Sequence, residues 1–337
     1  MAYYKDLREL LKSLEEKGKL IRIKRKINKD TELMPLARLQ FRGLPEEERK
    51  GFMFENITDA KGKKYDIPLV VGVIAASRDI YAIGMNCDSD KITEKWSETR
   101  TNPIEPIIVN SGPVQEVVHI GDSLLEHGGL EEFPIQISTP GYDSGPFITC
   151  PYVVTKDPET GIPNVGMYRA HVKSPTRTGV QFYSVTQHGA MHLAKAAKMG
   201  KPLETAIVIG GPPCLGYVAV TRLPYEVNEF AYASAIAGEP LEMVKCKSID
   251  LEVPAHAEIV IEGLLSTDEI EPEAPFGEAG GYVGKRDIMP YLTVTGITHR
   301  KNPIYQAILS QYPPQREQQD EEHRVLKWIV STLENRL

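Results

Sequence analysis

The hydrophobic pattern at the start of the chain predicts two helices. Four leucines recur at helical spacing, namely Leu7, Leu10, Leu11 and Leu14. Gly18 follows them and supplies a stop signal. The segment 30–41, "DTELMPLARLQF", predicts the second helix, with Asp30 or Thr31 as its N-cap.

Two further segments predict strands beside these helices. Residues 19–27, "KLIRIKRKI", alternate apolar with basic side chains, as a half-buried strand does. Residues 67–76, "IPLVVGVIAA", are continuously apolar and predict a buried strand. We therefore expect an N-terminal α/β domain over residues 1–112.

The middle of the chain is richer in strand patterns. Strands are expected at 179–188, 204–211, 257–263 and 291–299, two more around a Pro-Glu-Thr-Gly turn within 152–172, and helices at 190–201 and 227–238. This irregular order favours an α+β, barrel-like domain over 113–312 rather than a βαβ repeat. Residues 313–337 carry an apolar stripe at helical spacing, which predicts a long helix that packs on a partner chain or on a following domain.

Composition narrows the class of protein. The 337 residues carry a net charge of −7 and no basic block, which argues against a nucleic-acid surface. No apolar run is long enough to span a membrane. The four cysteines are far apart and form no CxxC motif, so we expect reduced thiols in a cytoplasmic protein.

One acidic pair lies on a segment rich in Pro and Gly. "PEAPFGEAGGY" at 272–282 places Glu273 and Glu278 around Pro275 and Gly277. Neither a helix nor a regular strand would direct residues five apart to the same side, so only a shaped loop brings both carboxylates together. A solvated acidic turn is the simpler alternative.

A second group of polar residues could hold a cation. Asn164, His188 and Glu229 are plausible ligands for Mg²⁺ or Mn²⁺, although they lie on different predicted elements. A structural histidine and a solvated glutamate are the alternatives. Arg169 lies in an apolar segment, and a strand would direct it away from Asn164, so a shared site requires a bulge, most simply at Gly166.

Taken together, several motifs make the chain resemble the UbiD family of decarboxylases. They occur in the family's order over nearly the whole chain, and comprise "YKDLRELLKSLEEKGKLIRIKRKI", "FENI", "NVGMYRAHV", "QHGAMHLAKAAKMGKPLETAIVIGGPP", "LEMVKCKSIDLEVPAHAEIVIEG" and "EPEAPFGEAGGYVG". The resemblance implies an N-terminal α/β domain followed by a split β-barrel domain related to flavin reductases. It also implies a C-terminal domain joined by a long helix, and we expect this chain to end within that helix, without the domain.

The resemblance further implies a cofactor and the residues that hold it. The cofactor is prenylated FMN, bound with Mn²⁺ (or Mg²⁺) and with K⁺ nearby. By position, Asn164, His188 and Glu229 would be the metal ligands. Gln187 and the backbone of Val165, Gly166, Met167, Tyr168 and Arg169 would line the flavin.

The implied activity is reversible, non-oxidative decarboxylation of an aromatic, heteroaromatic or α,β-unsaturated acid through a covalent adduct with prenylated FMN. Arg169, Glu273 and Glu278 match the family's catalytic network, with Glu278 as proton donor, Arg169 holding the substrate carboxylate and Glu273 orienting Arg169. Partners would be the acid and CO₂, a flavin prenyltransferase that supplies the cofactor, and further copies of the chain. A non-catalytic UbiD-like subunit and an FMN reductase on the same barrel are the alternatives.

Overall fold

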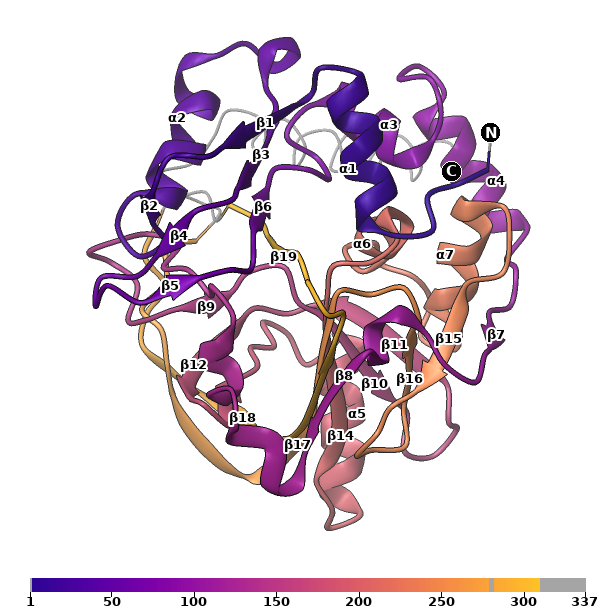
Figure 1. Ribbon diagram of the computed structural model, residues 1–337. Coiled ribbons are helices and arrows are strands. Elements are labelled where there is room, and N and C mark those ends of the chain that lie inside the picture. Colours follow the sequence, from indigo (N-terminus) through magenta and orange to yellow (C-terminus); the bar gives the residue numbers. More distant parts are fainter. Residues whose placement is uncertain (1, 279–281, 310–337) are drawn as a thin grey trace.

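The computed structural model describes residues 2–278 and 282–309 (Figure 1). Its helices are α1 (Leu7–Glu16), α2 (Leu33–Gly43), α3 (Arg78–Met85), α4 (Ile92–Thr101), α5 (His188–Lys198), α6 (Pro213–Val218) and α7 (Glu229–Ala237). Short 3₁₀ turns are η1 (Glu46–Glu48), η2 (Pro113–Gln115), η3 (Gly121–Leu125) and η4 (Gly129–Glu132). The helix predicted for 313–337 lies outside the described residues.

A small mixed sheet forms the N-terminal part. Its order is β1 (Leu20–Ile23), β3 (Gly51–Phe54), β6 (Leu69–Val71) and β19 (Tyr305–Ala307). The leucine stripe of α1 packs with α3 and with apolar residues of β3 and β6, because it is the one apolar face of an otherwise charged helix. β19 pairs in parallel with β6, so the chain returns to this sheet after the barrel. The domain limits at residues 112 and 312 stay a prediction.

The larger sheet contains nine strands in the described part of the chain. Its order is β11 (Pro163–Met167), β10 (Tyr152–Lys156), β14 (Leu203–Ile209), β17 (Ile259–Glu273), β18 (Asp287–His299), β13 (Arg177–Gly179), β12 (Ala170–Ser174) and β9 (Phe147–Ile148), and β8 (Val117–Ile120) also pairs with β18. The register of β17 with β18 shifts twice, and such irregularities bend strands. β17 and β18 accordingly curl into a half-barrel (Figure 1).

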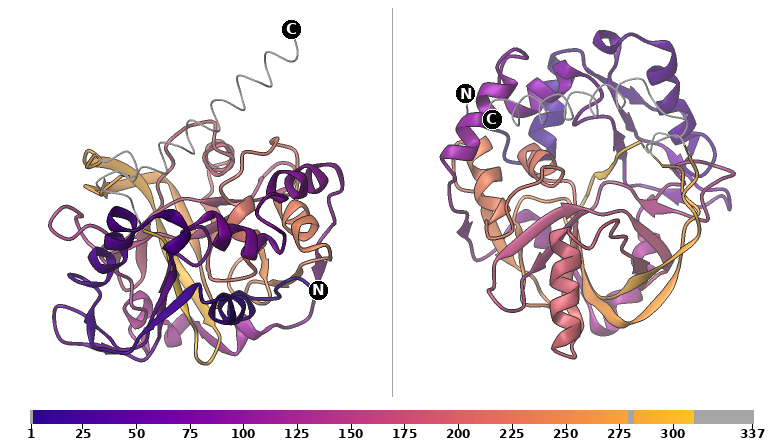
Figure 2. Two further views of the ribbon diagram at one scale, coloured as in Figure 1. Left: turned by 90° about the horizontal axis from the view of Figure 1, so that it is seen from above. Right: turned by 180° about the vertical axis from the view of Figure 1, so that it is seen from behind.

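Two three-stranded sheets complete the fold. One is β2 (Ile27–Asn28), β4 (Ile57–Thr58) and β5 (Lys64–Tyr65); the other is β16 (Glu252–Pro254), β15 (Glu242–Lys245) and β7 (Ile107–Ile108). Helix α5 packs lengthwise against strands β10, β11, β14 and β17 of the large sheet, as the view from behind shows (Figure 2). The architecture confirms the predicted α+β fold with a split β-barrel.

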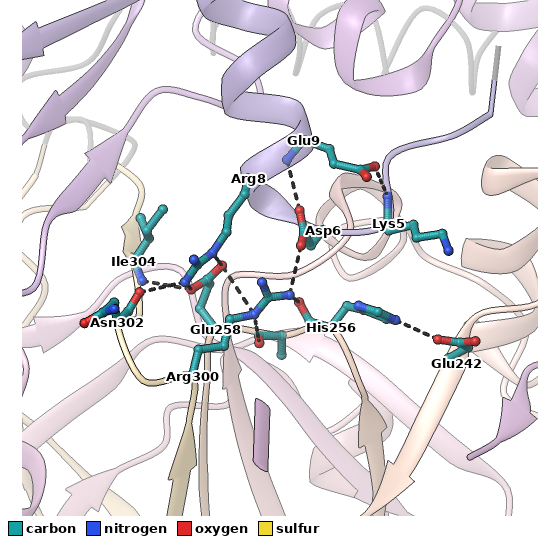
Figure 3. Close-up of polar contacts among 11 residues, drawn as sticks. Lys5, Asp6, Arg8, Glu9, Glu242, His256, Glu258, Arg300, Asn302 and Ile304 are labelled. Atoms are coloured by element: carbon teal, nitrogen blue, oxygen red, sulfur yellow. Dashed lines mark hydrogen bonds and ion pairs between the residues drawn. The ribbon is translucent and has the colours of Figure 1, made fainter. Parts of the chain in front are cut away.

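A partly buried charge network joins α1 to the barrel (Figure 3). Arg8 donates from Nε and Nη2 to the two carboxylate oxygens of Glu258, each at 2.9 Å, and Glu258 is fully buried. Arg300, at the end of β18, donates to Asp6 at 2.9 Å. The first helix is therefore attached to the two longest described strands by charge-assisted bonds.

Most predicted elements are present, but one expected N-cap and one expected strand were wrong. The helices expected at 190–201 and 227–238 are α5 and α7, and α7 ends before Gly238, which has a φ of 77°. The N-cap of α2 is Glu32, not Asp30 or Thr31. The expected strand at 179–188 is a loop from residue 180 to 187, because Gln187 bonds to backbone N–H groups of the loop instead of extending a ladder.

Candidate active site

A buried ion pair joins Arg169 to Glu273. Arg169 lies between β11 and β12, and Glu273 is the last residue of β17. Arg169 donates from Nε to Glu273 Oε1 at 3.0 Å and from Nη2 to Oε2 at 2.9 Å. Burial opposes the charge on Arg169, but the hydrogen bonds and charge of Glu273 outweigh it and raise the pKa of the guanidinium. Arg169 is therefore a fixed cation.

The second predicted carboxylate also reaches Arg169. Nη1 of Arg169 donates to Glu278 Oε1 and, at 2.7 Å, to the hydroxyl oxygen of Tyr183. Tyr183 in turn donates to Glu278 Oε2 at 2.6 Å. The Glu278 side chain is 25% exposed, whereas that of Glu273 is 1% exposed, so the two acids differ in their access to solvent.

Aromatic rings form the walls around this cation. The Arg169 guanidinium lies 4.5 Å from the ring centre of Phe276 and 5.8 Å from that of Phe147. Phe147 stacks on His171 with ring centres 4.3 Å apart. Burial lowers the pKa of His171 to about 4, with help from Lys173 and Arg169, so this imidazole is neutral near pH 7.

A second cluster forms where two helices begin. His188 and Glu229 are the first residues of α5 and α7, and both face strand β11. His188 Nδ1 lies 3.0 Å from Glu229 Oε1, and the Val165 N–H donates to Glu229 Oε2 at 2.5 Å. Burial raises the pKa of Glu229, although His188 and Val165 offset part of that effect.

Asn164 is the third predicted metal ligand, and its side-chain amide faces Glu229. Its oxygen faces the two carboxylate oxygens of Glu229, at 3.2 Å from each, so three acceptors point at one another. Turning the amide around would place its nitrogen there as a donor. With the amide oxygen turned toward Glu229, two oxygen-bearing side chains and one imidazole are a donor set that Mn²⁺ accepts.

The strand between the two clusters is regular, so the bulge expected at Gly166 was wrong. Residues 163–167 pair one for one with residues 152–156 of β10. The chain changes direction only at Tyr168 and Arg169, which lie between β11 and β12. Gly166 serves another purpose: a Cβ there would lie 2.4 Å from the ring of Tyr168.

The structure thus brings the predicted residues together as two neighbouring groups. Arg169, Glu273 and Glu278 form one, and Asn164, His188 and Glu229 form the other. The residues predicted to line a flavin lie on or next to these groups: Val165, Gly166 and Met167 in β11, Tyr168 after it, and Gln187 at the N-cap of α5. The amide oxygen of Gln187 already accepts from the Tyr183 N–H at 2.8 Å.

Sequence reasoning missed two residues of the first group. Tyr183 was placed in a strand, although its neighbour Ser184 is a residue typical of turns. Asp143, 130 positions before Glu273, accepts from the Gly277 N–H at 2.8 Å and so holds the loop that carries Glu278. Burial raises the pKa of Asp143 to about 6, although backbone donors offset part of the effect. No local signal links Asp143 to that loop.

Two family models match the chain. Residues 107–313 match the Rift-related domain of 3-octaprenyl-4-hydroxybenzoate carboxy-lyase (UbiD), and residues 11–99 match its N-terminal domain. The chain belongs to the UbiD family. The predicted resemblance is confirmed. Arg169, Glu273 and Glu278 all lie within the residues that match the Rift-related domain.

Solved UbiD-class structures superpose closely. An evolved dimeric form of HmfF from Pelotomaculum thermopropionicum, in complex with prFMN, is 33% identical with a TM-score of 0.82, over 91% of this chain and 68% of that one. Vanillic acid decarboxylase of Sedimentibacter hydroxybenzoicus, in closed form, is 31% identical with a TM-score of 0.85, over 93% of this chain and 66% of that one.

Curated relatives extend the comparison. An uncharacterised protein of Aquifex aeolicus is 36% identical over 355 residues, which cover 98% of this chain and 68% of the relative. An uncharacterised protein of Synechocystis is 34% identical, and the match covers 64% of it. The chain therefore spans about two thirds of the length of its curated relatives. Among the described residues, no helix is long and apolar enough to cross a membrane.

Proposed function

We propose that this UbiD-family chain catalyses the reversible, non-oxidative decarboxylation of an aromatic, heteroaromatic or α,β-unsaturated carboxylic acid with prenylated FMN. The observation that carries the proposal is the convergence of Glu273 and Glu278 on one buried arginine, Arg169. A solvated acidic turn would not bury Glu273 to 1% exposure.

Arg169 would bind the substrate carboxylate. Four of the five guanidinium N–H donors are engaged by Glu273, Tyr183 and Glu278, which leaves one on Nη2 without a partner among the described residues. Glu273 fixes the guanidinium plane through two parallel bonds, and this geometry restricts where a bound carboxylate can lie. Glu273 is thus a positioning residue for Arg169.

Glu278 would supply the proton. When CO₂ leaves, the C–C bonding pair stays behind, and a proton must be added at that carbon for the product to form. Glu278 can deliver this proton after taking it up from solvent, because its side chain is partly exposed. The bonds from Arg169 and Tyr183 hold the carboxyl group in place between transfers. The Tyr183 hydroxyl orients Glu278 through their hydrogen bond. Tyr183 is an exposed residue, so a proton from solvent can reach Glu278 along it.

The second group would hold the cofactor. Asn164, His188 and Glu229 would bind Mn²⁺ (or Mg²⁺), and the beginnings of α5 and α7 at this point favour a bound phosphate. When bound, prenylated FMN would supply an acceptor for the electron pair that decarboxylation releases. K⁺, a flavin prenyltransferase as cofactor supplier, a cytoplasmic location and homo-oligomers belong to the same proposal.

The experiment is isotope exchange with flavin-loaded protein. The chain is co-expressed with a flavin prenyltransferase, and incorporation of ¹³CO₂ into a panel of aromatic and acrylic acids is measured. We expect exchange in the wild type and none in Glu278→Gln, with the same bound-flavin spectrum in both. A wild type that carries the modified flavin and exchanges with none of the acids contradicts the proposal, and exchange in Glu278→Gln contradicts the role of that residue.

A further inference from the structure

The pairing of β8 with β18 brings together two histidines that the proposed decarboxylation does not use. In the antiparallel pair of β8 and β18, His119 lies opposite Ile297 and His299 lies opposite Val117. Side chains two apart share a face of a strand, so His119 and His299 are diagonal neighbours on one face. Their ring centres are 5.6 Å apart, and both side chains are more than nine-tenths buried.

One ring nitrogen of His299 is hydrogen-bonded, and the other has no hydrogen-bond partner among the described residues. Nδ1 lies 2.7 Å from the backbone oxygen of Arg300, an acceptor, so Nδ1 is the donor in this bond. Nε2 is the ring nitrogen left to present a lone pair, and this atom is buried. The same second-shell bond to a backbone carbonyl is the one that metal-binding histidines make.

A carboxylate faces that lone pair. Glu132, the last residue of η4, places Oε1 3.6 Å from His299 Nε2, and its buried Oε2 has no hydrogen-bond partner within the described part of the chain. Two acceptors that face each other in a buried place are stabilised by a proton or a metal ion between them. Ligand atoms of His119, Glu132 and His299 all lie within 4.8 Å of one another.

Two exposed residues extend the cluster toward solvent. His127 lies with its ring centre 4.8 Å from that of His119. Ligand atoms of His119, Glu126 and His127 also lie within 4.8 Å of one another.

We propose that His119, His299 and Glu132 form a binding site for a divalent transition-metal ion of the zinc class, with His127 at its solvent side. Two imidazoles and one carboxylate are a set that Zn²⁺ accepts with a fourth position left open. Mg²⁺ prefers oxygen ligands and fits this set poorly. The site uses none of the residues placed in the proposed decarboxylation, so it stands independently of that function.

Binding would fasten one edge of the barrel. The ligands come from β8, from η4 and from the last residue of β18, which are separated by up to 180 positions in the chain (299 − 119). A shared metal would therefore hold the segment that carries β8, η3 and η4 against β18, along the side where β8 pairs with β18 (Figure 1). A ligand that binds only the folded state stabilises it, so Zn²⁺ should raise the unfolding midpoint.

The test measures Zn²⁺ binding to the full chain after chelator treatment. Bound metal is counted by mass spectrometry, affinity is measured against a chromophoric chelator, and Co²⁺ is used as a spectroscopic substitute. The variants are His119→Ala, Glu132→Gln and His188→Ala. We expect one equivalent of Zn²⁺ that survives His188→Ala, and whose affinity falls by more than about 100-fold in His119→Ala, since even an outer-shell loss costs about 10–100-fold.

A matched control variant removes a histidine that is paired with a glutamate but belongs to no proposed metal site. His256 Nε2 lies 2.6 Å from Glu242, and His256→Ala should leave Zn²⁺ affinity unchanged. If His119→Ala alters folding, Glu132→Gln and the unfolding midpoint in chelator provide the second measurement. Unchanged Zn²⁺ affinity in folded His119→Ala or Glu132→Gln overturns the proposal, as does loss of all Zn²⁺ in His188→Ala or selective binding of Mg²⁺.

Discussion

The two acids that meet at Arg169 allow a prediction that separates folding from catalysis. Glu273→Gln removes a carboxylate whose side chain is 1% exposed from an arginine whose side chain is 7% exposed. Removing one partner of a buried ion pair costs about 3–5 kcal/mol. Arg169 keeps its bond to the partly exposed Glu278, so the loss should lie at the lower end of this range. We therefore expect Glu273→Gln to lower the free energy of unfolding by that amount, because a glutamine can accept only one of the two arginine bonds.

Glu278→Gln should behave differently. Arg169 keeps the bidentate Glu273 as counter-charge, and the Glu278 side chain is already 25% exposed. A partly exposed pair contributes about 1 kcal/mol or less, so this variant should remain nearly as stable as the wild type while losing isotope exchange. Glu278→Gln removes the proposed proton donor but leaves Arg169 with a counter-charge.

The control for burial is a more exposed ion pair made by Glu271, which lies two residues before Glu273 on β17. Arg177 donates to Glu271 at 2.5 Å, with side chains that are 42% and 24% exposed. Glu271→Gln should cost about 1 kcal/mol or less. Urea unfolding of the three variants, with equal slopes required, gives the comparison. Equal losses in Glu271→Gln and Glu273→Gln would refute the argument from burial.

Three further predictions test other parts of the structure. His188→Ala should lose Mn²⁺ and weaken flavin binding, and unchanged manganese content would show that the ligand set is wrong. Gly166→Ala should cost about 1–3 kcal/mol, because its Cβ would lie 2.4 Å from the Tyr168 ring. Gly43→Ala, whose Cβ would meet nothing within 4 Å, should instead stabilise by up to about 1 kcal/mol, and thermal unfolding compares the two variants. Burial lowers the pKa of His192 to about 4, so the folded state binds fewer protons than the unfolded state between pH 6.5 and 4. Stability is therefore complete above pH 6.5 and falls by up to about 3 kcal/mol toward pH 4, and His192→Gln should flatten that fall in stability–pH profiles.

Local patterns were sufficient for some of the regular elements. The leucines of α1, the helix α7 with Gly238 after it, and the hairpin of β10 and β11 follow from periodicity and turn chemistry, which act within a few residues. The order of motifs was sufficient for the family, because it samples the whole chain. The grouping of site residues also came from that order, and their roles remain proposals.

Only the tertiary structure decided what meets across the sequence. Asp143 holds the Gly277 loop and Tyr183 bonds to Glu278, because the curl of β17 and β18 places those segments side by side. The same applies to His119 and His299, which the register of two distant strands makes neighbours. Periodicity records which side of an element is buried, but it contains no information on which distant side chain is buried against it; that depends on strand order and register, which are set by the packing of the whole core.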